Sequence, residues 1–227
     1  GSGFVLGFVP NQLHRALSSS KEDVQNQLDS LASHRVVAST VRLPEDSPAE
    51  LVDPHDESQN LNDRARSYLH GNCSSCHHPG GNAIVSFYLR RELPFDDLKT
   101  NKGTGIGTFG LENAKLIVPG DPYRSVLLYR MSKLGYARMP YIGSRVVDSQ
   151  GVALIDQWIR SLPHEDSELD STPVQKGSQD QKLLSQLAST NRPRGSLGRV
   201  QQAAVDSLVK STAGALALSA GIHGGSI

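Results

Sequence analysis

Three stretches of the chain repeat apolar residues at the three- and four-residue spacing of one helix face. They are residues 21–37, 61–72 and 149–162. Asn60 or Asn62 stands where a side chain would cap the second stretch, and Asp148 precedes the third, which Pro163 ends. We therefore predict helices there, the third with an apolar stripe of Val152, Ile155, Ile159 and Leu162.

Weaker helical patterns lie elsewhere in the chain. Asp121 and Pro122 suit the N-cap and the first position of a helix that would close near Gly135. A short helix is expected within residues 11–20. Late in the chain, three short stretches have apolar faces with little else in the chain to pack on, which indicates part of a helical module. These stretches are residues 182–190, 197–211 and 214–222.

Polar and glycine-rich stretches separate these helices. Residues 39–60 are acidic, contain three prolines and are typical of an extended linker, as are residues 164–181. For the long loop over residues 82–114 we predict a small β-hairpin; its "GTGIGTFG" lacks the Lys-Ser/Thr pair of a phosphate loop. The predicted fold is mostly α, in three parts. They are an N-terminal helix and acidic linker (1–60), a helical domain with the loop inserted (61–163), and a linker with a partial helical module (164–227).

Composition adds an asymmetry of charge to this picture. The chain has no net charge, but residues 1–60 carry 4 Lys/Arg and 9 Asp/Glu, whereas residues 61–163 carry 13 and 8. The basic part is either an ordinary surface or one that attracts an acidic partner or an anionic ligand. No Lys/Arg run interleaved with aromatic residues indicates nucleic-acid binding. No apolar run approaches the roughly 20 residues of a membrane span.

Both cysteines of the chain lie in "GNCSSCHHPGG", at Cys73 and Cys76, and His77 follows directly. Zinc would need ligands from elsewhere, because these three residues and His78 are too close together to surround one ion. A thioredoxin-like pair needs a strand before it and a helix after it, and the predicted order here differs. A structural disulfide or two free thiols remain alternatives. The C-x-x-C-H spacing matches covalent haem attachment, in which both sulfurs bind haem vinyl groups and the histidine ligates the iron.

A haem that carries electrons usually has a second axial ligand, Met or His, on its opposite face. The chain has two methionines. Met131 falls inside a predicted helix and is expected to pack in the core. Met139 lies in the loop "ARMPYIGS", where Pro140 stiffens the backbone and no helical neighbours obstruct the thioether. We therefore predict Met139 as the distal ligand, 62 residues beyond His77.

The stretches "ARSYLHGNCSSCHHPGG", "LIVPGDPYRSVLLYRMS" and "ARMPYIGSRVVDSQGVALIDQWIRSL" together resemble monohaem class I cytochrome c domains. More narrowly, they resemble those of large bacterial proteins that contain PQQ-type dehydrogenase modules. The resemblance covers residues 61–163. It implies a class I cytochrome c-like helical fold and one covalent haem c, with thioethers at Cys73 and Cys76 and axial ligation by His77 and Met139.

The resemblance also implies roles for neighbouring residues and for the protein as a whole. The carbonyl of Pro119, in "VPGDP", would accept a hydrogen bond from the imidazole of His77. Arg138 is either a partner of a haem propionate or a free surface arginine. The implied function is single-electron transfer to a redox partner or a fused dehydrogenase domain, by a carrier rather than an enzyme, in the periplasm or outside the cell.

Two other functions stay open at this point. If Met139 does not bind iron, the protein would be a pentacoordinate haem enzyme or sensor, such as a peroxidase. If no haem is attached, the cysteines would serve a structural module through a disulfide or a metal ion.

Overall fold

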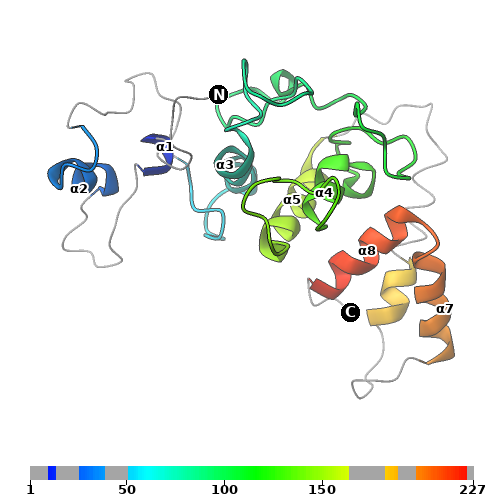
Figure 1. Cartoon of the computed structure of the whole chain (residues 1–227). Coiled ribbons are helices and arrows are strands. Elements are labelled where there is room, and N and C mark those ends of the chain that lie inside the picture. Colours follow the sequence, from blue (N-terminus) through cyan, green and yellow to red (C-terminus); the bar gives the residue numbers. More distant parts are fainter. Residues whose placement is uncertain (1–9, 14–25, 39–50, 164–181, 189–197, 224–227) are drawn as a thin grey trace. The chain divides into compact units, whose positions relative to one another are not determined.

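The computed structural model describes residues 10–13, 26–38, 51–163, 182–188 and 198–223. Within these ranges the regular elements are helices (Figure 1), and extended backbone pairs only at isolated bridges, such as that between Lys115 and Ser125. The predicted mostly α class is thus confirmed. No helix of the described ranges has both the length and the apolar character that crossing a membrane requires. The chain divides into two compact units, Gly1–Lys99 and Thr100–Ile227.

The first unit contains the short helices α1 (Pro10–Leu13) and α2 (Gln27–Ser33). Asn26 caps α2, because its side chain accepts the N–H of Leu28 at 2.9 Å. The helix ends earlier than the pattern predicts, before Arg35, whose φ is +58°. Residues 21–25 and 14–20 lie outside the described part of the chain.

Helix α3 (Leu61–Cys73) carries the core of this unit. Asn60 is its cap and accepts the N–H of Asn62 at 2.9 Å, which confirms the predicted start. The middle of α3 is buried all round, and its residues there are both apolar and polar. These are Ala65, Arg66, Ser67, Tyr68, Leu69 and His70. The hydroxyl of Ser67 accepts the N–H of Val52, so the segment that leads into α3 is tied back onto it.

The β-hairpin predicted over residues 82–114 is wrong. That range contains turns and the short 3₁₀ helix η1 (Asp96–Leu98), with no strand. The reason is where the backbone hydrogen bonds go. Leu89 donates its N–H to His77 O, Tyr88 to Leu98 O, and Arg91 to the ring of His70. The N–H groups of Leu89 and Arg91 are thus bound to α3 and to the turn that follows it, and that of Tyr88 to the end of η1, so they do not form a strand ladder.

The second unit is built around the 3₁₀ helix η2 (Pro122–Arg124) and helices α4 (Val126–Met131) and α5 (Ser149–Ser161). Asp121 caps η2 and Asp148 caps α5, as predicted. The single helix predicted from Pro122 to about Gly135 is wrong, because the chain is extended at Ser125 and α4 ends at Met131.

The late helices belong to the second unit. Residues 182–188 are helical, and α7 (Arg199–Leu208) packs on α8 (Thr212–His223). Helix α8 also contacts η2 and α5, and its Ala213 lies against the core cluster of Leu111, Ala114 and Val126. The expectation that these helices have little else to pack on is therefore wrong. The three-part division at residues 60 and 163 stays a prediction.

Candidate functional site

The sequence C-x-x-C-H forms one hydrogen-bonded turn at the end of α3. The carbonyl of Cys73 accepts the N–H of Cys76 at 3.1 Å and that of His77 at 2.9 Å. Ser74 closes the helix with both its N–H and its hydroxyl, which donate to the carbonyl of His70. The two cysteines are not bridged. The turn therefore holds two thiols and an imidazole on a single ordered piece of backbone.

The loop that follows binds the carbonyls of this turn. Ala83 donates its N–H to Cys76 O at 3.3 Å, and Leu89 donates to His77 O at 2.9 Å. Gly81 passes so close that a Cβ placed on it would lie 2.3 Å from Cys76 O. Only glycine fits that approach, since real Cβ atoms do not come within 3.0 Å of other heavy atoms.

The two adjacent histidines differ in their surroundings. The ring of His77 is buried and lies against that of Phe87, with a centroid distance of 4.1 Å and an interplanar angle of 31°. His78 is half-buried, and its Nδ1 lies 2.8 Å from the carbonyl oxygen of Pro79. The buried ring with a fixed orientation is the one that the spacing predicts as an iron ligand.

The two thiols also differ. Cys76 is exposed, whereas Cys73 is partly exposed as a residue but has a thiol that the protein withdraws from water. Burial, with a smaller effect of Cys76, raises the pKa of Cys73 to about 12. Since the thiolate is the reactive form, we expect Cys73 to react slowly in the folded chain.

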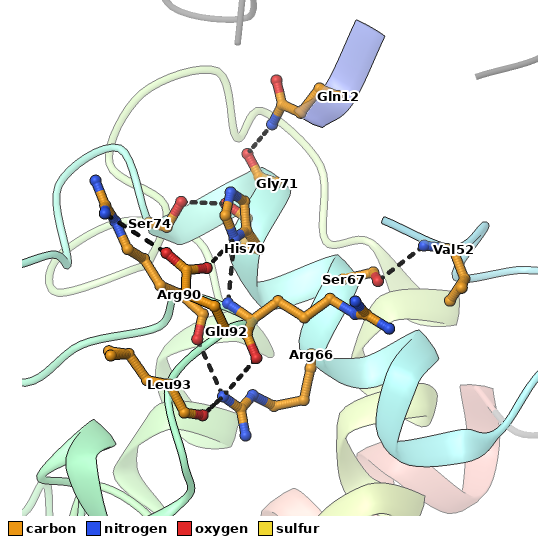
Figure 2. A network of polar contacts seen from close by, with 11 residues as sticks. Gln12, Val52, Arg66, Ser67, His70, Gly71, Ser74, Arg90, Glu92 and Leu93 are labelled. Atoms are coloured by element: carbon orange, nitrogen blue, oxygen red, sulfur yellow. Dashed lines mark hydrogen bonds and ion pairs between the residues drawn. The ribbon is translucent and has the colours of Figure 1, made fainter. Parts of the chain in front are cut away.

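A polar network behind the turn was not predicted from the sequence (Figure 2). The guanidinium of Arg66, in the buried middle of α3, donates to the carbonyls of Arg90, Arg91 and Leu93. The apolar spacing gives no signal for this network, because Arg66 and His70 fall on the other side of the helical pattern from Leu61 and Ala65. The network fixes residues 90–93 against the helix that ends in Cys73.

His70 is the second member of this network. The N–H of Arg91 donates to its Nδ1 at 3.1 Å, so that nitrogen carries no proton in this arrangement. Glu92 Oε2 lies 3.6 Å from the same nitrogen and becomes an ion-pair partner only when the ring is protonated. Burial lowers the pKa of His70; Glu92 opposes this shift, while Arg90 and Arg91 add to it.

Met139, the predicted distal ligand, lies in the second unit in a loop attached to α4. Its N–H donates to the carbonyl of Arg130 at 2.9 Å, and the side chain of Arg130 donates to Ala137 O at 2.8 Å. Met139 is half-buried, and its peptide bond to Pro140 is cis. Met131 is buried in α4, which confirms its predicted place in the core.

Arg138 and Pro119 have local contacts in the same unit. Arg138 donates to Ser144 Oγ at 3.1 Å and to Tyr141 O at 3.1 Å, and it lies over the Tyr141 ring. Its pairing with a propionate stays a prediction. Pro119 occupies a turn in which Asp121 donates its N–H to Val118 O at 3.0 Å and Gly120 has φ +78°.

Large exposed apolar side chains accompany both candidate ligand segments. In the first unit, Ile84 is 97% exposed in the loop that binds the Cys76 carbonyl. In the second unit, the segment around Met139 exposes Leu134, Tyr136, Tyr141, Ile142 and Val146. A single exposed side chain such as Ile84 is ordinary at a protein surface, whereas five within residues 134–146 are more than scattered exposure supplies.

The residues present fit a covalently attached haem better than a metal ion alone. Haem attachment needs two neighbouring thiols and an oriented imidazole, and the turn of α3 supplies them. Among the described residues, no three His, Cys, Asp or Glu side chains form a group that could hold a metal ion, which disfavours a zinc site there. No family model, curated protein or solved structure matches this chain.

Proposed function

We propose that this protein carries single electrons through one covalently bound haem c, as a class I cytochrome c-like module. The observation that carries the proposal is the turn from Cys73 to His77, which places two unbridged thiols next to a buried, oriented imidazole. The proposal places Cys73 and Cys76 in the thioethers, His77 as the proximal ligand and Met139 as the distal ligand.

The attachment uses only the thiols of the chain. Cys73 and Cys76 would each hold the haem through a thioether: the sulfur would bond to one carbon of a vinyl group, and the thiol hydrogen would go to the other. No electrons are gained or lost, so the reaction needs no oxidant. Because the thiol of Cys73 is withdrawn from water in the folded chain, we expect attachment before this turn has finished folding.

The axial residues set the properties of the site. When bound, a haem supplies an iron that alternates between Fe(II) and Fe(III). His77 is held by Phe87 against its ring and by Leu89 at its carbonyl, so the imidazole would keep one orientation. A thioether from Met139 would raise the reduction potential relative to a second imidazole. Pro119 would accept the remaining N–H of the ring and so increase its basicity.

The exposed apolar side chains support the same function. A porphyrin is a large, flat and mostly apolar ligand, so a chain that binds one needs apolar residues that the chain alone does not cover. Ile84 near the attachment turn and Tyr141, Ile142 and Val146 near Met139 supply such surface. They would also exclude water from the iron, which leaves a transferred electron as the main reaction.

The test is expression of the full chain together with a haem-attachment system. We expect a pyridine haemochrome spectrum of thioether-linked haem, one haem per chain, and the weak red absorption band of a methionine-ligated ferric haem. The double variant Cys73→Ala/Cys76→Ala should lose covalent haem. Met139→Ala should lose the red band, while Met131→Leu, the matched change at the core methionine, should keep it.

Each other outcome points to a different function. Covalent haem without the red band in the unmodified protein would indicate a pentacoordinate haem enzyme or sensor. Absence of covalent haem would reject the proposal and favour a structural role of the cysteines. The proposed partners, a redox protein or a fused dehydrogenase domain, and the location outside the cytoplasm follow from the haem and would be withdrawn with it.

A further inference from the structure

We propose that Arg130 is the positioning residue for Met139, and that two hydrogen bonds, one from its side chain and one to its backbone carbonyl, fix the loop that presents the thioether. This inference rests on the proposed function, because it matters only where Met139 binds iron. It assigns to α4 a role that neither the attachment sequence nor the loop sequence indicates.

Arg130 holds the loop at two points. Its backbone carbonyl accepts the N–H of Met139 at 2.9 Å, and its Nε donates to the carbonyl of Ala137 at 2.8 Å. These bonds lie on either side of Arg138, so two loop residues, Ala137 and Met139, are tied to one residue of α4. Arg130 is half-buried, and burial lowers the pKa of its guanidinium, so it has few water molecules to bind instead.

The residue whose carbonyl Arg130 binds, Ala137, has an unfavourable backbone conformation. Ala137 has φ +62° and is buried, with 2% of its surface exposed. A residue with a side chain adopts this left-handed conformation only at a cost, which its surroundings must offset. The bond from Arg130 to Ala137 O is the contact that offsets it. Without that bond, the loop would relax at the residue two positions before Met139.

The rest of the loop is held together by hydrogen bonds among its own residues. Arg138 donates to the carbonyls of Tyr141 and Gly135 and to the hydroxyl of Ser144, which in turn donates to Pro140 O. The loop therefore moves as one piece, with Arg130 as its described hydrogen-bonded attachment to α4. Displacement of this piece would move the Met139 sulfur without unfolding the loop.

Three variants of the haem-loaded full chain separate the hydrogen bond from the charge. Arg130→Met keeps the length of the stem and removes the donor. Arg130→Gln removes the charge but keeps an amide nitrogen at the position of Nε. Arg145→Met removes a charge from an exposed arginine of the same loop. The measurements are the red ferric band and the affinity of added imidazole, which competes with Met139 for the iron.

We expect imidazole to bind Arg130→Met about tenfold more tightly than the unmodified protein, with a weaker red band, because one charge-assisted hydrogen bond is lost. Arg130→Gln and Arg145→Met should stay within about twofold of the unmodified protein. Equal behaviour of Arg130→Met and Arg145→Met would overturn the inference. So would equal effects in Arg130→Gln and Arg130→Met, since the charge would then matter rather than the bond.

A measurement on the unmodified protein covers the case in which Arg130→Met does not fold. The amide hydrogen of Met139 should exchange slowly, because it is bound to Arg130 O; exchange as fast as that of an unbonded loop amide would overturn the inference. If the unmodified protein has no covalent haem or no red band, the proposed function itself fails. If it has both and the Arg130 variants leave them unchanged, only the positioning role fails.

Discussion

Replacement of Gly81 by alanine tests whether the loop after residue 77 holds the turn from Cys73 to His77 in place. A Cβ on Gly81 would lie 2.3 Å from Cys76 O and 3.0 Å from His78 O. Both contacts are with backbone, so no flexible side chain can move aside. Gly80 gives a matched control: its φ is +76°, but a Cβ there has nothing within 4 Å. Gly80→Ala therefore strains the backbone without touching the turn.

The size of the effect follows from these distances. Ordinary contacts of a Cβ begin near 3.4 Å, so Cys76 O must retreat by about 1 Å. The bond from Ala83 N to Cys76 O is already 3.3 Å long and would break. The bond from Gly81 N to His78 O, at 2.9 Å, would weaken. With about 1 kcal/mol for each bond and the overpacking added, we expect Gly81→Ala to lose about 2–4 kcal/mol of unfolding free energy. Gly80→Ala should lose about 1–2 kcal/mol for its left-handed backbone.

The assay combines urea denaturation with amide hydrogen exchange of the full chain. Because the expected losses of unfolding free energy in the two variants are close in size, the amide hydrogen exchange of Ala83 and Leu89 is the measurement that distinguishes them. Both amides donate to carbonyls of the turn, so they should exchange faster in Gly81→Ala and keep their protection in Gly80→Ala. Equal protection of these amides in the two variants would refute the argument that Gly81 holds the turn.

Three further predictions concern the polar groups of the first unit. Arg66→Met should lower the unfolding free energy by about 2–3 kcal/mol, because the two hydrogens of its Nη2 bind three backbone carbonyls that would be left unsatisfied, while Arg64→Met, which loses one charge-assisted bond, should cost about 1 kcal/mol in the same urea titration. Burial holds the pKa of His70 below its usual 6.5, so the unfolded chain binds a proton there at a higher pH than the folded chain does. The stability that depends on this group should therefore be fully present above pH 6.5 and decrease below it. Denaturation at several pH values should show a smaller decrease for His70→Asn. In the chain without haem, iodoacetamide should modify exposed Cys76 well before Cys73, as followed by peptide mass spectrometry, and equal rates would contradict the raised pKa of Cys73.

The helices that the sequence predicts most accurately are those with strong local signals at their ends. Asn60 and Asp148 stand next to the first helical residue and accept an N–H of the first turn, so α3 and α5 begin where the pattern places them. The turn from Cys73 to His77 is equally local, since the N–H of His77 donates to the carbonyl of Cys73. A prediction from neighbouring residues succeeds where the neighbours supply the contacts.

The break at Ser125 shows why a local pattern fails elsewhere. Its hydroxyl donates to Asp121 O and accepts the N–H of Val118, and the N–H groups of Val126 and Leu127 donate to the carbonyls of residues 115 and 116. In a continuous helix those N–H groups would bind carbonyls four residues earlier. The competing acceptors come from about ten residues upstream, and nothing in the apolar spacing indicates them.

The same comparison explains why the loop before η1 resembles a strand in sequence but is not one. Burial alternates along it, with Phe87 and Leu89 buried in the first unit, but its backbone bonds to His77 O and to the ring of His70. The loop is thus an extension of the attachment turn, held by side chains of α3. Candidate binding residues, such as those of the proposed haem site, can be predicted from a short sequence because their chemistry fixes their spacing. The residues that orient them come from wherever the fold brings a donor to an acceptor, so Arg66 and Arg130 become visible only once the chain is folded.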